Sequence, residues 1–490
     1  MALVPLSIPP GVYRNGTDLQ SAGRWRDASL VRWTDGTMQP VGGWQARVTV
    51  AADKVMRGAI AWTDNNNDKR FACGSYEKLY AISAGGTVTD ITPSGLVAGT
   101  VDASQNLGYG GGFYGTGLYG VARPDIGNYS PATTWALDVW GQFLVACSSK
   151  DGKIYEWQLN TANDAALITN APTSNRSIVV TEERFLFALG AGGNPRKVQW
   201  SDREDNTTWT PAITNQAGSL TLPGTGVLMQ GLRMRGQTLI LSDEDAHLAT
   251  YQGGEFVYGF ERVGTACGVV SQLAAVSLDT SAYWMGTSGF FRYAGAVEPL
   301  VCDVADYVFT NMNTVQRSKV FAVTNAKHNE IWWFYPSSSS TEIDSYVTFN
   351  VKEGHWSIGQ LARTAGFDRG TFANPIYFAA DGKAYDHEIS STLATAPFAE
   401  SGPISIGNGD QVMCVTSLIP DEKTQGQVTA TFKTRFHPND VERSYGPYSM
   451  ANPISVRFTG RQVRMRVTGA ANESWRVGIM RVEAVPGGRR

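Results

Sequence analysis

The chain carries few residues of the types that catalysis or metal binding requires, and they are scattered along it. Its five histidines form no H-E-x-x-H motif and its cysteines form no C-x-x-C pair, so the sequence predicts no zinc site. No G-x-S-x-G nucleophile elbow and no Walker A loop occurs. Acidic pairs such as Glu182–Glu183 and Asp243–Asp245 lie in polar, turn-like stretches, where solvated charge is the default interpretation. We therefore predict no catalytic residue, no metal ligand and no cofactor, and a protein that is not an enzyme.

Two short motifs resemble functional sites but lack the context that such sites need. Residues 115–120 (GTGLYG) fit the G-x-G-x-x-G pattern, yet Gly-Tyr repeats precede them and Pro124 follows, so nucleotide binding is not expected. Residues 202–209 (DREDNTTW) resemble a degenerate Asp-box, the turn of sialidase-type propellers. That turn is structural, so it favours a propeller without implying hydrolysis.

A third motif has part of the spacing of a calcium loop. Asp64, Asn66 and Asp68 have the spacing of the first three ligands. Lys69 and Ser75 stand where the loop needs its glycine and its bidentate glutamate. A polar turn between two strands is the favoured interpretation.

Positive charge is concentrated at the C-terminal end. The net charge is −3, but residues 457–490 hold eight Arg against two Glu, which leaves −9 on the remainder. Arg464 and Arg466 alternate with apolar residues, so both side chains are expected on one face of a strand. We interpret them as interface residues that dock on an acidic neighbour or meet a phosphate backbone; an ordinary solvated strand face is the alternative.

A Gly- and Tyr-rich stretch (GYGGGFYGTGLYG, 108–120) lies in an insertion that spans roughly residues 93–131. It has no periodic apolar face, so it is expected to leave the body of the protein as an extended loop. The functional interpretation is that it presents aromatic side chains to a partner, and the alternative is a mobile surface loop. The candidate interface residues are Tyr109, Phe113, Tyr114 and Tyr119.

The elements that must position these residues are strands. Seven segments have the pattern of an apolar strand, a Gly- or Asn-containing turn and a second strand, and six of them follow one another at intervals of about 40 to 53 residues. That interval matches one four-stranded blade, so we predict an all-β fold built on a β-propeller of six to eight blades. Helix is expected only near 302–316 and 418–423. The seven segments are 71–82, 143–157, 185–200, 238–251, 282–295, 320–335 and 375–388.

The hairpin repeat divides the chain. It ends near residue 390, and long strands that alternate apolar and polar residues follow, so residues 391–490 are predicted to form a C-terminal β-sandwich-like module. Residues 31–390 form the predicted propeller and residues 1–30 an N-terminal arm. A strand near Leu30–Trp33 or Trp44–Val50 is expected to complete the last blade and protect its edge.

Composition limits the class of protein. With 42% hydrophobic and 17% charged residues, the chain has ample material for a core, which excludes a disordered chain. Five widely spaced cysteines in apolar stretches indicate buried free thiols and folding in a reducing cytoplasm. No apolar run reaches 18 residues, and the first residues lack a basic region and contain three prolines, so neither a membrane span, a signal peptide nor a lipid anchor is expected.

Several strings together resemble the tail-nozzle (tail-hub) proteins of short-tailed double-stranded DNA phages, sometimes labelled packaged-DNA stabilisation proteins. The similarity extends over most of residues 8–390, and because none of the strings is a catalytic signature, its specificity rests on their number and order. The strings are IPPGVYRNGTDLQSAGRWRDASLVRW (8–33), PVGGW (40–44), VQWSDREDNTTWTPAITNQAG (198–218), YWMGTSGFFRYAG (283–295), NEIWWFYPSSSS (329–340), YVTFNVKEGHW (346–356) and LARTAGFD (361–368).

The resemblance implies a structural virion protein of the phage tail, assembled in the cytoplasm of a bacterial host. Such a protein forms a ring with copies of itself, usually a hexamer, below the portal-adaptor ring, and carries tail fibres or spikes. The ring is the conduit for retention and ejection of double-stranded DNA, which it contacts without sequence specificity, and so serves viral genome delivery. The net negative charge is consistent with a wall past which DNA slides, since each neutralised phosphate would add affinity.

Two functions of other classes remain open at this point. A propeller glycan hydrolase would need converging carboxylates and an Arg cluster at the propeller axis. A glycan-binding tail adhesin would need exposed Trp and Tyr along a shallow groove.

Overall fold

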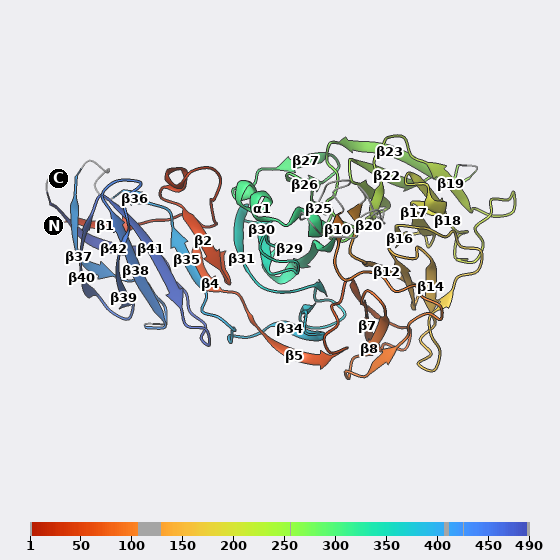
Figure 1. The fold of residues 1–490 in the computed structure, drawn as a ribbon, viewed down its shortest axis with the longest axis horizontal. Helices are drawn as coiled ribbons and strands as arrows, with labels where there is room; N and C mark the ends of the chain where they lie inside the picture. Colours follow the sequence, from red (N-terminus) through yellow and green to blue (C-terminus); the bar gives the residue numbers. More distant parts are fainter. Residues whose placement is uncertain (1, 106–128, 255, 406–410, 425, 488–490) are drawn as a thin grey trace, which may run out of the picture.

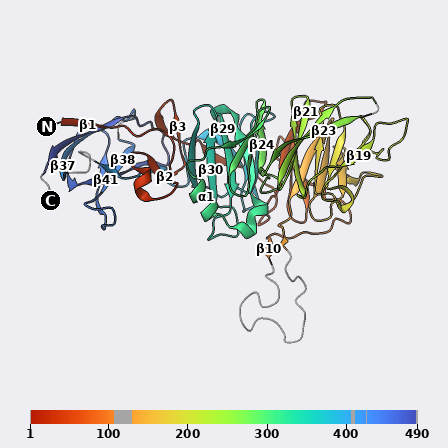
Figure 2. The ribbon, with the colours of Figure 1, turned by 90° about the horizontal axis from the view of Figure 1, so that it is seen from above.

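The computed structural model describes residues 2–105, 129–254, 256–405, 411–424 and 426–487, and it shows two β-structures side by side (Figures 1 and 2). Seven four-stranded antiparallel sheets, each called a blade below, form a propeller. The first strand of each sheet lies against the first strands of its two neighbours, and β32 lies against β6, so the circle is closed. The predicted all-β propeller fold is confirmed.

The first four blades follow one another in the chain, and in each the strands pair in sequence order. The first blade contains β6 (Ala59–Thr63), β7 (Lys69–Gly74), β8 (Leu79–Ser83) and β9 (Val88–Asp90), and the second β12 (Trp135–Trp140), β13 (Phe143–Ser148), β14 (Ile154–Trp157) and β15 (Ala166–Leu167). The third contains β16 (Ser177–Val180), β17 (Leu186–Leu189), β18 (Lys197–Trp200) and β19 (Gly218–Thr221). The fourth contains β20 (Leu228–Met234), β21 (Gln237–Ser242), β22 (Asp245–Tyr251) and β23 (Tyr258–Thr265).

The last three blades include the closure of the circle. In the seventh blade the outer strand is β5 (Gly43–Thr49), which comes from the N-terminal part of the chain and pairs with β34, as predicted for residues 44–50. The fifth blade contains β24 (Ala275–Leu278), β25 (Ser281–Met285), β26 (Phe290–Tyr293) and β27 (Val297–Leu300). The sixth contains β28 (Phe321–Asn325), β29 (Glu330–Tyr335), β30 (Ser345–Asn350) and β31 (His355–Gln360). The other strands of the seventh are β32 (Ala365–Phe367), β33 (Ile376–Phe378) and β34 (Lys383–Ser390).

The second structure is a two-sheet sandwich in which alternate residues of the long strands face its core, as on β41, where Val463, Met465 and Val467 are buried. Its outer sheet has the order β1 (Ala2–Leu6), β42 (Met480–Pro486), β37 (Met413–Ile419), β40 (Ile454–Gly460). Its inner sheet has the order β2 (Trp25–Ser29), β35 (Phe398–Ser401), β41 (Gln462–Gly469), β38 (Val428–Arg435), β39 (Arg443–Ser449), and β36 (Ile404–Ser405) also pairs with β41.

The N-terminal segment differs from the predicted arm. Strand β1 is the edge strand of the outer sheet of the sandwich, where it pairs with β42. Strand β2 is the edge strand of the inner sheet, where it pairs with β35. The next residues form a hairpin of β3 (Val31–Thr34) and β4 (Thr37–Pro40), so Leu30–Trp33 does not complete a blade. Asp35 and Gly36, both at positive φ, form the two-residue turn that such a hairpin needs.

Helix is scarce in the described residues. The helix expected within 302–316 is α1 (Ala305–Asn311), whereas β37 and a turn occupy 418–423, where a second was expected. No described helix is long and apolar enough to cross a membrane. The described 3-10 turns are η1 (Asp18–Ser21), η2 (Ala191–Gly193), η3 (Thr314–Lys319) and η4 (Ala326–His328). The remaining strands, β10 (Ser104–Gln105) and β11 (Tyr129–Ser130), pair with each other outside the blades.

Burial explains why the two structures hold together. Most buried clusters lie between two neighbouring blades, as does the cluster that contains Trp62 of the first blade and Trp135 of the second. The largest cluster continues from blades four to six into the sandwich through Trp25, Trp33 and Trp356. Because propeller and sandwich share this core, their relative position is fixed by packing.

Candidate functional site

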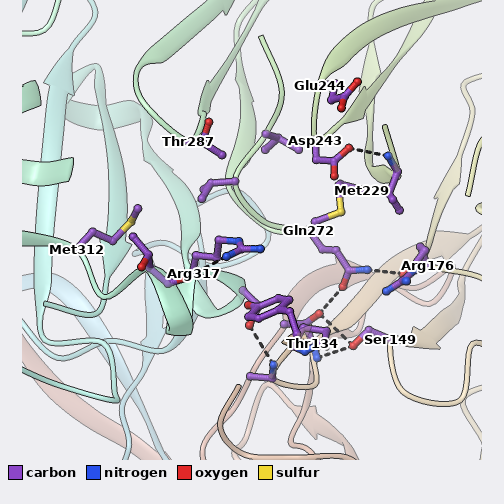
Figure 3. Close-up of a pocket in the computed structure, with 18 residues that line it drawn as sticks. Thr134, Ser149, Arg176, Met229, Asp243, Glu244, Gln272, Thr287, Met312 and Arg317 are labelled. Carbon is purple, nitrogen blue, oxygen red and sulfur yellow. Dashed lines mark hydrogen bonds between the residues drawn. The ribbon is translucent and has the colours of Figure 1, made fainter. Parts of the chain in front are cut away.

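A candidate site is the cavity of about 500 Å³ at the axis of the propeller (Figure 3). It is lined by the segments that precede the first strands of several blades and by the turns between their second and third strands. Its polar residues include Thr134, Ser149, Arg176, Gln272 and Arg317.

One side chain bridges the axis at this cavity. Gln272 precedes β24 of the fifth blade, and its Nε2 donates a hydrogen bond of 2.8 Å to the backbone oxygen of Arg176, before the third blade. The Thr134 hydroxyl, before the second blade, donates to Gln272 Oε1 over 2.5 Å. Gln272 therefore ties three blades together, and the propeller axis is not an open channel for a macromolecule (Figure 3).

The carboxylates at this cavity are engaged by the backbone and side chains of one loop. Asp243 Oδ1 accepts a hydrogen bond of 2.6 Å from the backbone N–H of Val227, and Glu244 accepts one from the Thr225 hydroxyl. Both acids belong to the single turn between β21 and β22. A glycosidase needs two carboxyl groups that flank the bond from separate positions, so this pair does not supply its arrangement.

The other predicted acidic pairs are structural. Asp245 is buried and forms a bidentate ion pair with Arg196 at 2.8 and 3.1 Å, so its interpretation as solvated charge is wrong. Burial alone would raise the pKa of Asp245, but the hydrogen bonds from Arg196 and Ser242 bring it below its usual value. Glu182 accepts a hydrogen bond from Gly236 N–H, and Glu183 one from the Tyr258 hydroxyl.

The base of the 93–131 insertion is anchored beside the same cavity. Gln316 makes two hydrogen bonds with the backbone of Ala103, at 2.9 and 2.8 Å. The buried Lys319 ammonium donates to Asp102 over 2.5 Å, and the Arg317 guanidinium lies 4.2 Å from the ring centre of Tyr129. β10 and β11 then pair, so the insertion leaves and returns at one place on a propeller face (Figure 2). Tyr109, Phe113, Tyr114 and Tyr119 lie outside the described residues.

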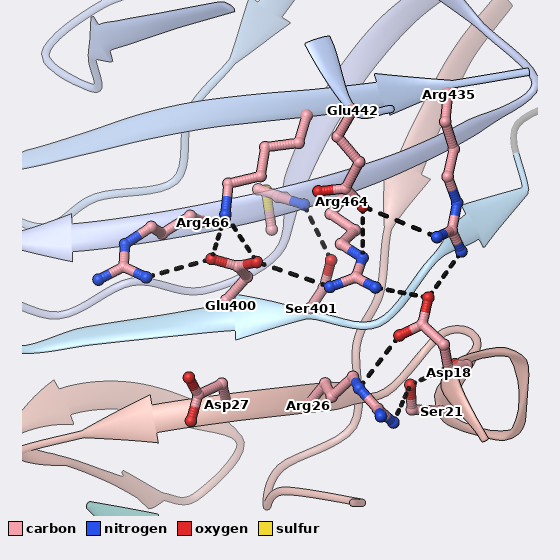
Figure 4. A network of polar contacts seen from close by, with 12 residues as sticks. Asp18, Ser21, Arg26, Asp27, Glu400, Ser401, Arg435, Glu442, Arg464 and Arg466 are labelled. Carbon is pink, nitrogen blue, oxygen red and sulfur yellow. Dashed lines mark hydrogen bonds and ion pairs between the residues drawn. The ribbon is translucent and has the colours of Figure 1, made fainter. Parts of the chain in front are cut away.

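Arg464 and Arg466 lie on one face of β41, as the alternation predicted, but both are paired within the chain (Figure 4). Arg464 contacts Asp18 at 2.5 Å and Glu442 at 3.0 Å. Arg466 contacts Glu400 at 3.1 Å, and its guanidinium lies 3.6 Å from the ring centre of Phe398. The two side chains are 19% and 33% exposed and paired, so the alternative of an ordinary solvated strand face is wrong, while their interpretation as interface residues stays a prediction.

The acidic partners of these arginines show the strength of the network. Burial alone would raise the pKa of Asp18, but hydrogen bonds from Arg435 and Arg464 hold it below its usual value. Burial alone would also raise the pKa of Glu400, but its contacts with Lys433 and Arg466 hold it below its usual value. Asp18 comes from the N-terminal segment, so the network fastens that segment to the inner sheet of the sandwich.

The remaining motifs have structural roles where they are described. Asp64 Oδ1 accepts the backbone N–H groups of Asn66 and Asp68 at 3.0 and 2.9 Å, which makes the predicted polar turn. In the Asp-box-like segment Asp205 accepts hydrogen bonds from Thr207, and the buried Trp209 lies under the turn. Among described residues no cluster of three or more His, Cys, Asp or Glu side chains is arranged to hold a metal ion. Residues 115–120 lie outside the described part.

No described tryptophan or tyrosine is exposed on the surface, although Phe256 is. Thirteen of the fourteen tryptophans are buried, and the other, Trp44, is half-buried against His387 and Arg363. No described tyrosine is exposed either. The described surface therefore shows no exposed Trp or Tyr of the kind expected along the groove of a glycan-binding adhesin.

A polar junction centred on Arg32 was not predicted from the sequence. This buried side chain makes bidentate ion pairs with Glu330 of the sixth blade and Glu388 of the seventh, over 2.6 to 3.0 Å. Nearby, Val12 N–H donates to the backbone oxygen of Trp356 and so joins the segment 8–33 to β31. The dense Arg and Trp content of this segment was the available signal.

No protein-family model matches the chain, and no curated protein matches it in sequence. Among solved structures it is similar to virginiamycin B lyase from Staphylococcus aureus, with a TM-score of 0.42 and 7% identity over 70% of this chain and 98% of that chain. It is also similar to BamB from Moraxella catarrhalis, with a TM-score of 0.39 and 11% identity over 81% and 100%. A third similar structure is PorZ, an essential bacterial surface component of the type-IX secretion system of Porphyromonas gingivalis, with a TM-score of 0.39 and 8% identity over 76% and 44%. These likenesses concern the fold alone.

Proposed function

We propose that this chain is a structural subunit of a phage tail, a nozzle or hub protein that forms a ring with copies of itself below the portal-adaptor ring. The ring is the conduit for DNA retention and ejection and the platform for fibres or spikes. The resemblance of residues 8–390 to tail-nozzle proteins motivates the proposal, and the protein acts without catalysis.

The observation that carries the proposal is the junction formed by residues 8–33, the first of the strings that resemble nozzle proteins. In the fold this segment contacts the sandwich through Asp18 and blades six and seven through Arg32. It thereby fixes the sandwich against the propeller. A ring subunit needs such a rigid body, because a small error in angle at each interface would prevent closure of the ring.

The bridged axis specifies where DNA passes in this proposal. Since Gln272 ties three blades together across the axis, a duplex cannot follow the axis of one propeller. The conduit is therefore the lumen that several subunits enclose. The predominance of acidic residues on the propeller, 33 Asp and Glu against 25 Lys and Arg in residues 43–390, favours a wall that does not retain DNA.

Purified protein tests the proposal in two measurements. Sedimentation at increasing protein concentration should show a discrete closed oligomer. Incubation with bacterial surface polysaccharide should release no reducing sugar, with a known glycan hydrolase as the positive control. A strictly monomeric protein that releases sugar would contradict the proposal and favour the glycan hydrolase.

A further inference from the structure

Two arginines on the outer sheet of the sandwich have no acidic partner among the described residues. Arg457 on β40 and Arg481 on β42 are exposed, and neither forms an ion pair with any described residue. Arg464 and Arg466 of the inner sheet are, by contrast, engaged by Asp18 and Glu400. Arg457 and Arg481 thus place unpaired positive charge at the end of the molecule that is remote from the propeller (Figure 1). Among the described residues after 390, other exposed basic residues without an ion pair lie off this sheet, namely Lys423, Arg443 and Arg476.

The two arginines share one face of the outer sheet. β40 and β42 both pair with β37, on its opposite sides. The neighbours of Arg457 in sequence, Val456 and Phe458, are buried in the sandwich core, and so are those of Arg481. Because side chains alternate along a strand, both guanidinium groups project away from that core.

The rest of this face is mixed in character. Leu3 on β1 is 53% exposed and lies opposite Glu483 in the strand register. The Glu483 carboxylate accepts a hydrogen bond of 3.2 Å from the Thr416 hydroxyl. A face with two free cations, an exposed leucine and a carboxylate suits a protein surface, whereas a phosphate backbone is held by cations without interspersed acids.

The chain itself supplies a surface of complementary charge. Residues 43–390 carry a net charge of −8, from 25 Lys and Arg against 33 Asp and Glu. Residues 1–42 and 391–490, which include the sandwich and the β3–β4 hairpin, carry +5, from 16 against 11. In a ring each interface joins different faces of neighbouring subunits, so opposite charges on the two bodies attract at every interface.

We propose that the outer face of the sheet β1–β42–β37–β40, with Arg457 and Arg481, docks on the propeller of a second copy of this chain. The inference rests on the ring-subunit proposal and names the surface that makes the contact. Attraction between exposed charges sets the register of the docked subunits and weakens as salt rises.

The test compares two double variants of the full chain by sedimentation at low salt. In the first, Arg457→Glu and Arg481→Glu reverse both docking charges. In the control, Arg235→Glu and Arg262→Glu change the net charge equally, on exposed arginines of the fourth blade. The docking variant should need at least about tenfold more protein for half-assembly, since like charges then face each other. The control should assemble at least as readily as the wild type, because it only makes the propeller more acidic, and both should keep the wild-type melting temperature.

The outcomes separate this inference from the ring proposal. Normal assembly of the docking variant, with wild-type rings present, would overturn the inference and leave the ring. A wild-type protein that stays monomeric at every concentration would overturn both. Unchanged assembly together with lost binding to a 20-base-pair duplex, measured by fluorescence anisotropy, would assign the face to DNA and also overturn the inference.

Discussion

Removal of the Arg32 side chain tests whether the junction holds the two bodies. Arg32 is 4% exposed and joins β3 to Glu330 on β29 and Glu388 on β34 through four hydrogen bonds. Burial alone would raise the pKa of Glu388, but the adjacent Arg32 lowers it to about 2. The ion pair is therefore intact at neutral pH.

The Arg32→Met variant leaves two carboxylates buried without their cation. Removal of one partner of a buried ion pair costs about 3–5 kcal/mol, and we expect a loss of this size in the free energy of unfolding at pH 7. Urea unfolding followed by tryptophan fluorescence measures it. The control Arg235→Met, on an exposed turn, should change stability by less than about 0.5 kcal/mol.

A triple variant separates charge from packing at the same place. Adding Glu330→Gln and Glu388→Gln to Arg32→Met removes the unpaired charges and should restore part of the lost stability. A loss below about 1 kcal/mol in Arg32→Met would refute the role of this junction. An undiminished loss in the triple variant would show that packing of the guanidinium, and not its charge, holds the hairpin to the blades.

Three further predictions concern pH, the sandwich network and the insertion. Burial lowers the pKa of His328 to about 4 and that of His387 well below its usual value, so the unfolded chain binds more protons. Stability is complete above pH 6.5 and falls as pH drops toward 4, by about 3 kcal/mol for His328 alone, which melting curves from pH 8 to 4.5 measure. Reversing Arg464 and Arg466 to Glu should destabilise the sandwich by at least about 2 kcal/mol in urea, because Asp18 and Glu400 would face new carboxylates; an unchanged midpoint would contradict the network. Replacing residues 106–128 by Asn-Gly should leave the melting temperature within a few degrees, because β10 and β11 already pair, but should impair assembly; a drop of more than about 10 °C would place the segment in the core.

The propeller could be predicted because its signal is local. Each blade contains a hairpin whose apolar strands and turn residues are adjacent in sequence, as in 143–157, which forms β13 and β14. The segment 320–335 shows the limit of this reasoning. Its hairpin joins the first and second strands of the sixth blade, β28 and β29, whereas the other six join the second and third. Both kinds of turn carry the same residue types, so sequence does not separate them.

The long-range contacts could not be predicted. The alternation around Arg464 correctly placed it on one strand face, but its partner Asp18 lies at the other end of the chain. Likewise β1 and β2 are short strands whose partners, β42 and β35, come several hundred residues later. Pairing across such distances depends on the whole fold, so the sequence predicted an arm for the N-terminal residues and did not reveal the partners of the two arginines within the chain.

The central claim is that the chain works as a ring subunit, and electron microscopy of the purified wild-type protein tests it most directly. Class averages should show closed rings of identical subunits around an open lumen, with the sandwich of each subunit against the propeller of the next. Fields of single, separate particles at concentrations up to tens of micromolar, each the size of one chain, would contradict the account.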